Sequence, residues 1–446
     1  MGARSQGRGA LWRIRDLRVI LPARVLSYTG DTLTLFALTL RVHDEGGGAS
    51  GIALLLAAFA LPMALTVGIA GHVADRADSR RILVTASLVQ AAALAGLVLT
   101  GTGPQMYLFV IALQLGQSFA NPTWAALLPR AVGEHNLGRV TAVQQGALAV
   151  TGVVGAAVAG VTAGRFGHDA PLWIALGAFL ALSVAAAAVR TRRHGDPDGT
   201  PLTLAAQIWS AAGFRVLHAD PVSWTLLSSM VPFVLALETA NVLEVFLVRD
   251  SLDASTTVFG LVQAASAAGT VGGAAWASQM RTERSRIHLA IGGVAGAGAS
   301  MLVAGAAPDE VVLAIAFAGI GLFVMASTVC LWPVLLMRTV EADRGKVSAA
   351  ANGASRLASM VALGLGALAG GYLGPRWSFA LAGLTAILVA ARSWHHLRVV
   401  VQDGLGGGGD QSRGADQSRG AWAGGGTAAR EPDDAPSSAR SDPASE

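Results

Sequence analysis

The longest stretch without a charged residue constrains what this chain can fold into. Residues 82–129 contain no Asp, Glu, Lys or Arg over 48 positions, and a helix that crosses a bilayer needs only about 20 apolar residues. The turn sequence Gly101-Thr102-Gly103-Pro104 divides this stretch into two spans. Ten further spans are predicted at 22–42, 46–71, 140–164, 170–189, 223–248, 254–280, 287–308, 311–337, 347–373 and 376–396. The sequence therefore predicts twelve transmembrane helices.

Composition excludes the main alternatives to a membrane protein. Only 13% of the residues are charged and 53% are hydrophobic, whereas soluble domains carry about 25% charged residues. This excludes a soluble enzyme, a secreted disulfide scaffold and a disordered chain. The single cysteine, Cys330, excludes an intramolecular disulfide and a cysteine-based metal cluster. The net charge of +4 comes from basic residues scattered between apolar blocks, which is not the footprint of a nucleic-acid-binding protein.

The distribution of basic residues predicts the orientation. Of the 32 basic residues, 26 lie at the termini and in the loops after even-numbered spans, and 4 lie in the opposite loops. Arg24 and Arg356 lie within spans. Because cytoplasmic loops carry the excess of Lys and Arg, both termini are predicted to be cytoplasmic, in a multi-pass protein of the inner (cytoplasmic) membrane.

The chain repeats itself. Residues 127–132 (LLPRAV) match 335–340 (LLMRTV) at an offset of 208, and residues 138–142 (GRVTA) match 345–349 (GKVSA) at an offset of 207. At the same offset of 207, Asp31 in the first span matches Glu238 in the seventh. The expected fold is an all-α membrane protein with two parallel six-helix repeats, an architecture of transporters.

This repeat sets the predicted domain boundaries. They are a basic cytoplasmic N-terminus at 1–21, an N-terminal six-helix half at 22–190, a cytoplasmic linker at 191–222, a C-terminal six-helix half at 223–400 and a tail at 401–446. The tail is rich in Gly, Ser, Asp and Pro and cannot bury a core, so it is predicted to be disordered and cytoplasmic.

The segment after the second span resembles the signature loop of the major facilitator superfamily. That loop has Gly, three residues, Asp-Arg, one residue, Gly and then basic residues, and the matching positions here are Gly71, Asp75, Arg76, Arg80 and Arg81. Asp78 stands where Gly is usual. Together with Gly30-Asp31 and the LLP sequence at 127–129, this form is similar to the siderophore-exporter and macrolide-efflux-type branch. The resemblance covers about residues 20–400 and implies the major facilitator fold and efflux.

The signature loop has two interpretations. Asp75 could accept charge-assisted hydrogen bonds from a neighbouring Arg or from a helix N-terminus of the other half, as a latch that favours the outward-facing state. Alternatively, the arginines around it only satisfy the topology rule.

Ionisable residues inside spans are functional candidates because their burial in lipid is costly. Asp31 lies about 14 Å into the first span, near the midplane. Glu238, Asn241 and Glu244 follow one another at three-residue steps, so they share about 120° of one helix face, which predicts a cavity lining. Burial disfavours an ionised carboxyl group, so Asp31 or Glu238 could bind and release protons. Structural hydrogen bonding remains open for both residues, and Glu244 could instead reach the outer interface.

Two further polar residues complete the set of proton and substrate candidates. Arg356 lies deep in the eleventh span, where it could bind an anionic substrate group or pair with Asp31 or Glu238. Gln144, like Gln114, Gln117, Gln145, Gln263 and Asn352, could bind substrate or hold helices together.

No cofactor or metal is predicted. No strand precedes the glycines of the fifth and eleventh spans and no Walker lysine exists, so they form no nucleotide site, and His395-His396 has no further ligands nearby. The superfamily's antiporter motif in span five has Gly-Pro, and this chain has Gly155-Ala156.

Three functions follow from these features. The first is a monomeric secondary transporter that exports a small amphipathic molecule, such as a drug, siderophore or secondary metabolite, against proton entry by alternating access. The second is an importer or facilitator of a polar solute with the same fold. A membrane-embedded enzyme would need clustered His, Asp or Cys in its spans, and a sensor would need a folded soluble domain, so both are disfavoured. The expected partners are the substrate, protons and the lipid bilayer, without nucleic acid.

Overall fold

The computed structural model describes residues 17–100, 103–132, 134–189 and 211–420. Within these ranges, the side chains of 67–68, 75, 129–131, 134–139, 142, 211 and 399–420 are not described. Apart from one short 3₁₀ turn, the regular structure of the described residues is α-helical. The contacts divide the chain into two units, Met1–His396 and Leu397–Glu446.

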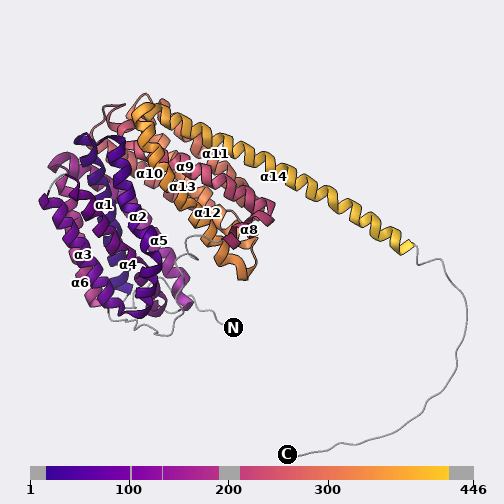
Figure 1. Ribbon diagram of the computed structural model, residues 1–446, viewed down its shortest axis with the longest axis horizontal. Helices are drawn as coiled ribbons and strands as arrows, with labels where there is room; N and C mark the ends of the chain where they lie inside the picture. Colours follow the sequence, from indigo (N-terminus) through magenta and orange to yellow (C-terminus); the bar gives the residue numbers. More distant parts are fainter. Residues whose placement is uncertain (1–16, 101–102, 133, 190–210, 421–446) are drawn as a thin grey trace, which may run out of the picture. The chain divides into compact units, whose positions relative to one another are not determined.

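Two sets of long helices make up the first of these units, to which the last helix contributes its residues up to His396 (Figure 1). The first set is α1 (Leu17–Asp44), α2 (Gly48–Arg76), α3 (Ser79–Thr100), α4 (Gln105–Val132), α5 (Glu134–Phe166) and α6 (Asp169–Ala188). The second set is α9 (Pro221–Arg249), α10 (Thr256–Ala277), α11 (Glu283–Ala306), α12 (Glu310–Met337), α13 (Arg344–Tyr372) and α14 (Gly374–Gly420). We call these sets the first and second halves. A short helix, α8 (Ala211–Ala219), precedes α9.

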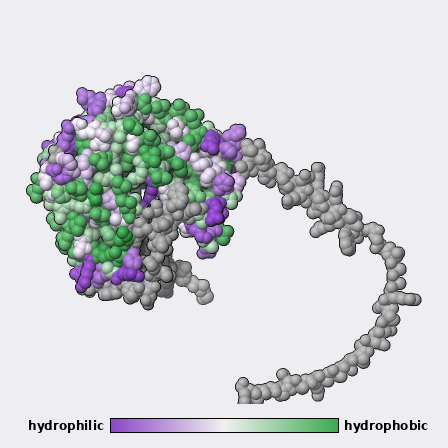
Figure 2. All heavy atoms as spheres, viewed as in Figure 1, coloured by the Kyte–Doolittle hydropathy of each residue, from purple (hydrophilic) through white to green (hydrophobic). Residues whose placement is uncertain are grey.

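The long helices have the length and surface of membrane spans. Within the described residues, 10 of them are long and apolar enough to cross a bilayer. The other two, α1 and α4, each have 28 residues, so the twelve long helices of the described part are consistent with the predicted number of spans. Figure 2 shows green apolar side chains over the middle of the helical body and purple hydrophilic ones toward its two ends. The expected all-α membrane fold is confirmed.

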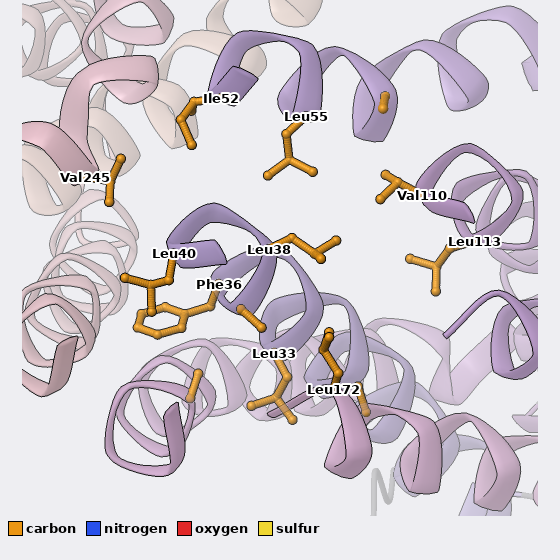
Figure 3. Close-up of a cluster of buried hydrophobic side chains, with 14 of the residues drawn as sticks. Leu33, Phe36, Leu38, Leu40, Ile52, Leu55, Val110, Leu113, Leu172 and Val245 are labelled. Atoms are coloured by element: carbon orange, nitrogen blue, oxygen red, sulfur yellow. The ribbon is translucent and has the colours of Figure 1, made fainter. Parts of the chain in front are cut away.

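The first helix lies at the centre of its half. Leu33, Leu38 and Leu40 of α1 are fully buried, and Figure 3 shows Leu33 beside Leu172 of α6 and Leu40 on another side of α1, next to Phe36. Because α1 is buried among its neighbours, its side chains are held in defined positions along its length, including those that reach the space between the halves.

The halves meet along two pairs of helices, α5 with α10 and α2 with α13. A Cβ atom added at Gly160 of α5 would lie 2.6 Å from the Cα atom of Gly260 of α10. A Cβ added at Gly370 of α13 would lie 2.3 Å from the Cβ of Ala49 of α2. Glycine therefore permits the close approach of the halves at both crossings.

These crossings identify the end at which the halves meet. Gly370 and Ala49 lie at the end of the bundle that carries the α1–α2, α5–α6 and α9–α10 connections. We call this the outer end, because the distribution of basic residues predicts that it faces away from the cytoplasm.

Two segments contain helix that the sequence analysis did not predict. The predicted linker contains helix α8, whose Gly213 packs closely on the backbone of Lys346 at the start of α13. The residues 190–210 lie outside the described part. Helix α14 continues to Gly420, past the boundary near 400 beyond which disorder was predicted. Glycines 406–409 lower helix propensity by about 1 kcal/mol each, but they keep the backbone donors and acceptors that a helix needs.

An ion-pair cluster fixes the inner end of the second half. Arg338, after α12, donates from Nε and NH2 to the two carboxylate oxygens of Asp220 at 2.7 and 2.8 Å, and from NH1 to Glu283 at 2.7 Å. Asp220 also caps α9 by accepting from the backbone N–H and hydroxyl of Ser223. The Arg338 guanidinium and then Ser223 lower the pKa of Asp220 to about 2. The cluster joins the ends of α9, α11 and α12.

Replacing this guanidinium should destabilise the second half. We expect Arg338→Gln to lower the free energy of unfolding by about 2 kcal/mol, because charge-assisted hydrogen bonds to two partly buried carboxylates are lost. Since the pKa of Asp220 is depressed in the folded state, this contribution is present above about pH 4 and is lost as the pH falls through about 2. Thermal unfolding in detergent at pH 7 measures the effect, and Arg284→Gln, which removes a neighbouring cation without a described ion pair, is the control. Equal unfolding curves for both variants would show that the cluster contributes nothing.

Candidate functional site

A cavity of about 420 Å³ lies between the halves. Its walls come from α1, α2 and α5 of the first half and from α9 and α10 of the second. The lining residues are Tyr28, Thr32, Leu35, Phe36, Thr39, Ile52, Leu56, Gly152, Ala156, Asn241, Glu244, Val245, Phe259, Gln263, Ser266, Ala267 and Thr270. This volume is in the range of sites that hold small organic molecules.

Most of the wall is apolar or aromatic. The rings of Phe36 and Phe259, from opposite halves, approach to 5.1 Å between centroids. The ring of Tyr28 lies close to Gly152 of α5, because a Cβ atom added at Gly152 would be 3.8 Å from it. Glu244 is the one ionisable side chain with a carboxyl group in the lining, and the lining holds no Lys, Arg or His.

Glu244 has spare hydrogen-bonding capacity within this cavity. One of its carboxyl oxygens is buried and has no hydrogen-bond partner among the described residues. The side chain interacts with the amide of Gln263, which lies opposite on α10. Of the two alternatives for Glu244, the structure selects the cavity over the outer interface. A buried acceptor without a partner is costly unless a ligand or proton satisfies it.

The polar stripe of α9 extends from Glu244 toward the cytoplasmic end. Asn241 donates from its amide to Glu238 Oε2 at 3.1 Å, and Asn241 and Glu244 both line the cavity. Glu238 itself is half-buried and lies beside the lining residues. The structure thus brings together the three residues that the three-residue spacing placed on one face.

Asp31 lies outside the cavity lining. It belongs to α1, two turns from Arg24, and Arg24 donates to Asn121 of α4 at 2.9 Å. In the same interface, Ser27 donates to Gln117, which also accepts from Gln90 of α3. One oxygen of Asp31 is buried without a partner among the described residues. Asp31 therefore belongs to a polar seam between α1 and α4 rather than to the wall of the cavity.

Arg356 is exposed on α13, and no described residue forms an ion pair or hydrogen bond with it. The structure thus contains neither of the pairs with Asp31 or Glu238 that the sequence suggested. Asn352 lies five full turns before Gly370, which packs on α2, and Arg356 lies about 40° from that line at 100° per residue. Both side chains therefore project from the α13 face that meets the first half.

Gln144 is displaced from the cavity-facing line of α5. At 100° per residue, Gln145 lies about 20° from Gly152, which lines the cavity, whereas Gln144 lies about 80° away. Gln145 is also the more exposed of the two. A one-residue difference decides which amide faces the space between the halves, and the sequence could not distinguish them.

The signature loop begins inside α2, which ends at Arg76. Asp78, the residue that replaces the usual Gly, accepts from the backbone N–H groups of Arg80 and Arg81 at 2.9 and 3.1 Å. Asp78 therefore caps the start of α3, which is a structural reason for this departure from the pattern. The side chain of Asp75 lies outside the described part, so its role as a latch stays a prediction. At the offset of 208, its counterpart in the second half is Glu283, which pairs with Arg338.

A cluster that the sequence analysis did not single out lies at the outer end. His43 approaches Asp44 Oδ1 with Nδ1 at 2.8 Å and Asp250 Oδ1 with Nε2 at 2.7 Å. His168 Nε2 lies 2.8 Å from Asp44 Oδ2, and an Arg249 nitrogen lies 3.6 Å from Asp44 Oδ1. His43 belongs to the first half and Asp250 to the second, so the cluster joins the halves where they close the outer end.

The sequence profile of the Major Facilitator Superfamily matches residues 20–363 of this chain. This chain belongs to the major facilitator superfamily. Members of this superfamily are membrane transporters and are generally not enzymes, so the expected class of protein is supported.

Relatives of the chain carry transport names. An uncharacterized MFS-type transporter, YfiS of Bacillus subtilis, is 23% identical over 386 residues, which cover 84% of this chain and 91% of YfiS. The multidrug efflux pump Tap of Mycolicibacterium fortuitum is 25% identical over 220 residues, which cover 47% of this chain. The chain spans about half of that pump, 54% of its length. The resemblance to an efflux-type branch is supported.

Solved structures share the fold. The POT family transporter PepTSo superposes with a TM-score of 0.65 at 12% identity, over 86% of this chain and 98% of PepTSo. A bacterial homologue of the human lysosomal transporter Spinster, in an inward-facing and unoccupied conformation, gives a TM-score of 0.63 at 13% identity, over 89% of this chain and 99% of that one. At these identities the likeness concerns the fold alone. Together with the match to the family profile over residues 20–363, this fold makes the chain a multi-pass membrane transporter of the superfamily.

Proposed function

We propose that this chain is a secondary active transporter that exports a small amphipathic molecule in exchange for protons. The observation that supports it most is the cavity between the halves, whose wall combines apolar and aromatic residues with polar ones and includes a carboxyl oxygen of Glu244 that has no partner among the described residues. Alternating access needs a site that both halves share, because only such a site is exposed to each side in turn. The similarity to multidrug efflux pumps favours export.

The chemistry of the wall favours a cationic substrate. A carboxylate in a partly enclosed site attracts an organic cation more strongly than it would in bulk water, and no basic side chain of the described lining competes for it. The exposed ring of Tyr28 offers a face for a cation, and the buried pair of Phe36 and Phe259 supplies apolar wall behind it. An anionic amphiphile would meet repulsion from Glu244. We therefore assign amphipathic cations as the favoured substrates.

Glu238 and Asp31 are the proposed proton carriers. Glu238 accepts a hydrogen bond from Asn241, which lines the substrate cavity. Asp31 has a buried oxygen without a partner among the described residues, so a negative charge on it would not be stabilised by a hydrogen bond and a proton would bind there readily. In an exchanger, proton and substrate must stabilise different states, since a ligand with equal affinity for both states shifts no equilibrium.

Transport in everted membrane vesicles tests this proposal. With a proton gradient, vesicles that contain the protein should accumulate an amphipathic cation, and they should release it when a protonophore collapses the gradient. A panel of dyes, antibiotics and siderophores of either charge, with vesicles lacking the protein as the control, measures the substrate class. Accumulation that is equal with and without the gradient would instead favour a facilitator.

A further inference from the structure

The outer cluster contains a contact that a neutral histidine cannot make. Each ring nitrogen of His43 faces a carboxylate oxygen, Asp44 Oδ1 at 2.8 Å and Asp250 Oδ1 at 2.7 Å. Neutral imidazole has one N–H, so it can donate to only one of these oxygens, and its second nitrogen would oppose an oxygen lone pair. Both contacts become hydrogen bonds only if the group holds one more proton, on the imidazole or on one carboxyl group.

The two ends of this contact are related by the internal repeat. His43 and Asp250 are separated by 207 positions, the offset that also relates Asp31 to Glu238. The equivalent positions of the two halves therefore meet at the outer end, where α1 and α9 end. Since each residue belongs to a different half, any movement that opens the outer end must separate them.

From these contacts we infer that His43, with Asp44 and Asp250, forms a proton-binding site at the outer end that is complete only while the halves are closed there. When Asp250 moves away, His43 keeps Asp44 as a partner, and the second hydrogen bond that the extra proton makes possible is lost. Proton binding and closure of the outer end therefore favour each other, and the coupling is reciprocal.

The surroundings of His43 support this site. Its side chain is only 11% exposed, and the Phe246 ring of α9 packs on it at 5.2 Å. From the α5–α6 connection, His168 shares Asp44, and from the end of α9, Arg249 faces Asp44 at 3.6 Å. His168 uses one ring nitrogen, so its contact needs no extra proton.

The other charges around the cluster are Arg41, Asp169 and Glu45. Arg41 of α1 pairs with Asp169 of α6 and donates to the backbone oxygen of Leu97. Glu45 is exposed beside the cluster. Partial burial alone would raise the pKa of Asp44, but the hydrogen bond from His43 and the charges of His168 and Arg249 lower it below its usual value. Asp44 thus stays available as the negative partner.

This site would give the proposed exporter a second use of the external proton. After the substrate leaves, a proton from outside binds His43, the outer end closes on it, and the carrier returns toward the cytoplasm. The order of these steps rests on the proposed function, because it assumes export in exchange for protons. The existence of the proton-binding site does not depend on that function.

Distances between spin labels test the site without substrate or transport. Labels at Ser50 and Glu310, exposed outer-end residues of different halves, report opening, with the buried Cys330 replaced by alanine. In lipid nanodiscs, we expect the population with the short, closed distance, relative to the population with the long, open distance, to fall about tenfold between pH 5 and pH 8. Coupling between two sites is usually of this size. An unchanged ratio over this range would overturn the inference. Because no transport is measured, failure of the proposed function would leave this result unaffected.

Two matched variants assign the effect to His43. His43→Gln has one amide and no titratable group, so the pH dependence should disappear. His43→Arg is permanently charged and should keep the outer end closed at every pH. If either variant retains the transition of the unmodified protein, the proton binds elsewhere, with His168 the next candidate. If His43→Gln does not fold, His43→Arg and a double variant, His43→Asp with Asp250→His, test the site instead. The double variant exchanges the two partners, so it should keep the pH dependence, and a loss of the pH dependence counts against the site.

Discussion

Replacing Glu244 by glutamine should weaken the binding of an amphipathic cation about 30-fold, which corresponds to about 2 kcal/mol. The reason is that Glu244 supplies the negative charge of a cavity whose other lining residues are neutral. Glutamine keeps the size and one carbonyl oxygen, so the shape of the cavity is conserved. Binding of a fluorescent cation to the purified protein in detergent, at constant pH and ionic strength, measures the loss.

A neutral substrate analogue and a second variant make this prediction specific. An uncharged analogue of the same size should bind the glutamine variant within about twofold of the unmodified protein, because it gains little from the charge. Ser266→Ala removes a polar group from the same wall and should affect both compounds alike. Equal losses for cation and neutral analogue in Glu244→Gln would mean that the charge of Glu244 does not select the substrate.

The sequence predicts the helices of this chain better than the site between them. Spans are recognised from length and lack of charge, and the repeat follows from matches such as Arg130 with Arg338. The stripe of Glu238, Asn241 and Glu244 was also predictable, because three-residue steps share a face in any helix. These features depend on neighbours in the chain and need no knowledge of packing.

The features that sequence reasoning missed depend on which helices meet. Phe36 and Phe259 are core residues, and the sequence could not show that their rings, one from α1 and one from α10, meet between the halves. His43 and Asp250 are single polar residues at helix ends, and only the closure of the outer end makes them partners. Comparing repeat-related positions for opposite charge was the available signal, since the axis between parallel repeats can bring equivalent residues together.

Neutralising the proposed proton carriers should separate substrate binding from proton-driven transport. We expect Asp31→Asn or Glu238→Gln to abolish uphill, proton-driven export while binding and downhill exchange remain measurable. A carrier carboxyl group takes a proton on one side and gives it up on the other, so without it the proton no longer favours one state over the other. Counterflow of labelled substrate, compared with gradient-driven accumulation in the same vesicles, measures the two activities separately.

The surroundings of the two carboxyl groups give the expected order of effects. Glu238 lies beside the cavity through Asn241, so a substrate bound there can influence its proton directly. Asp31 lies in the seam where Arg24 is engaged with Asn121, and it can respond only through movement of α1. We therefore expect the stronger loss of coupling in Glu238→Gln, and a smaller loss in Asp31→Asn. Asn121→Ala, which frees Arg24, should change the loss of coupling caused by Asp31→Asn without changing the loss caused by Glu238→Gln.

If both neutralised proteins still drive uphill export with an unchanged pH dependence, neither residue carries the proton. In that case Ala156, which stands in place of the antiporter proline, would indicate that the chain does not exchange substrate for protons.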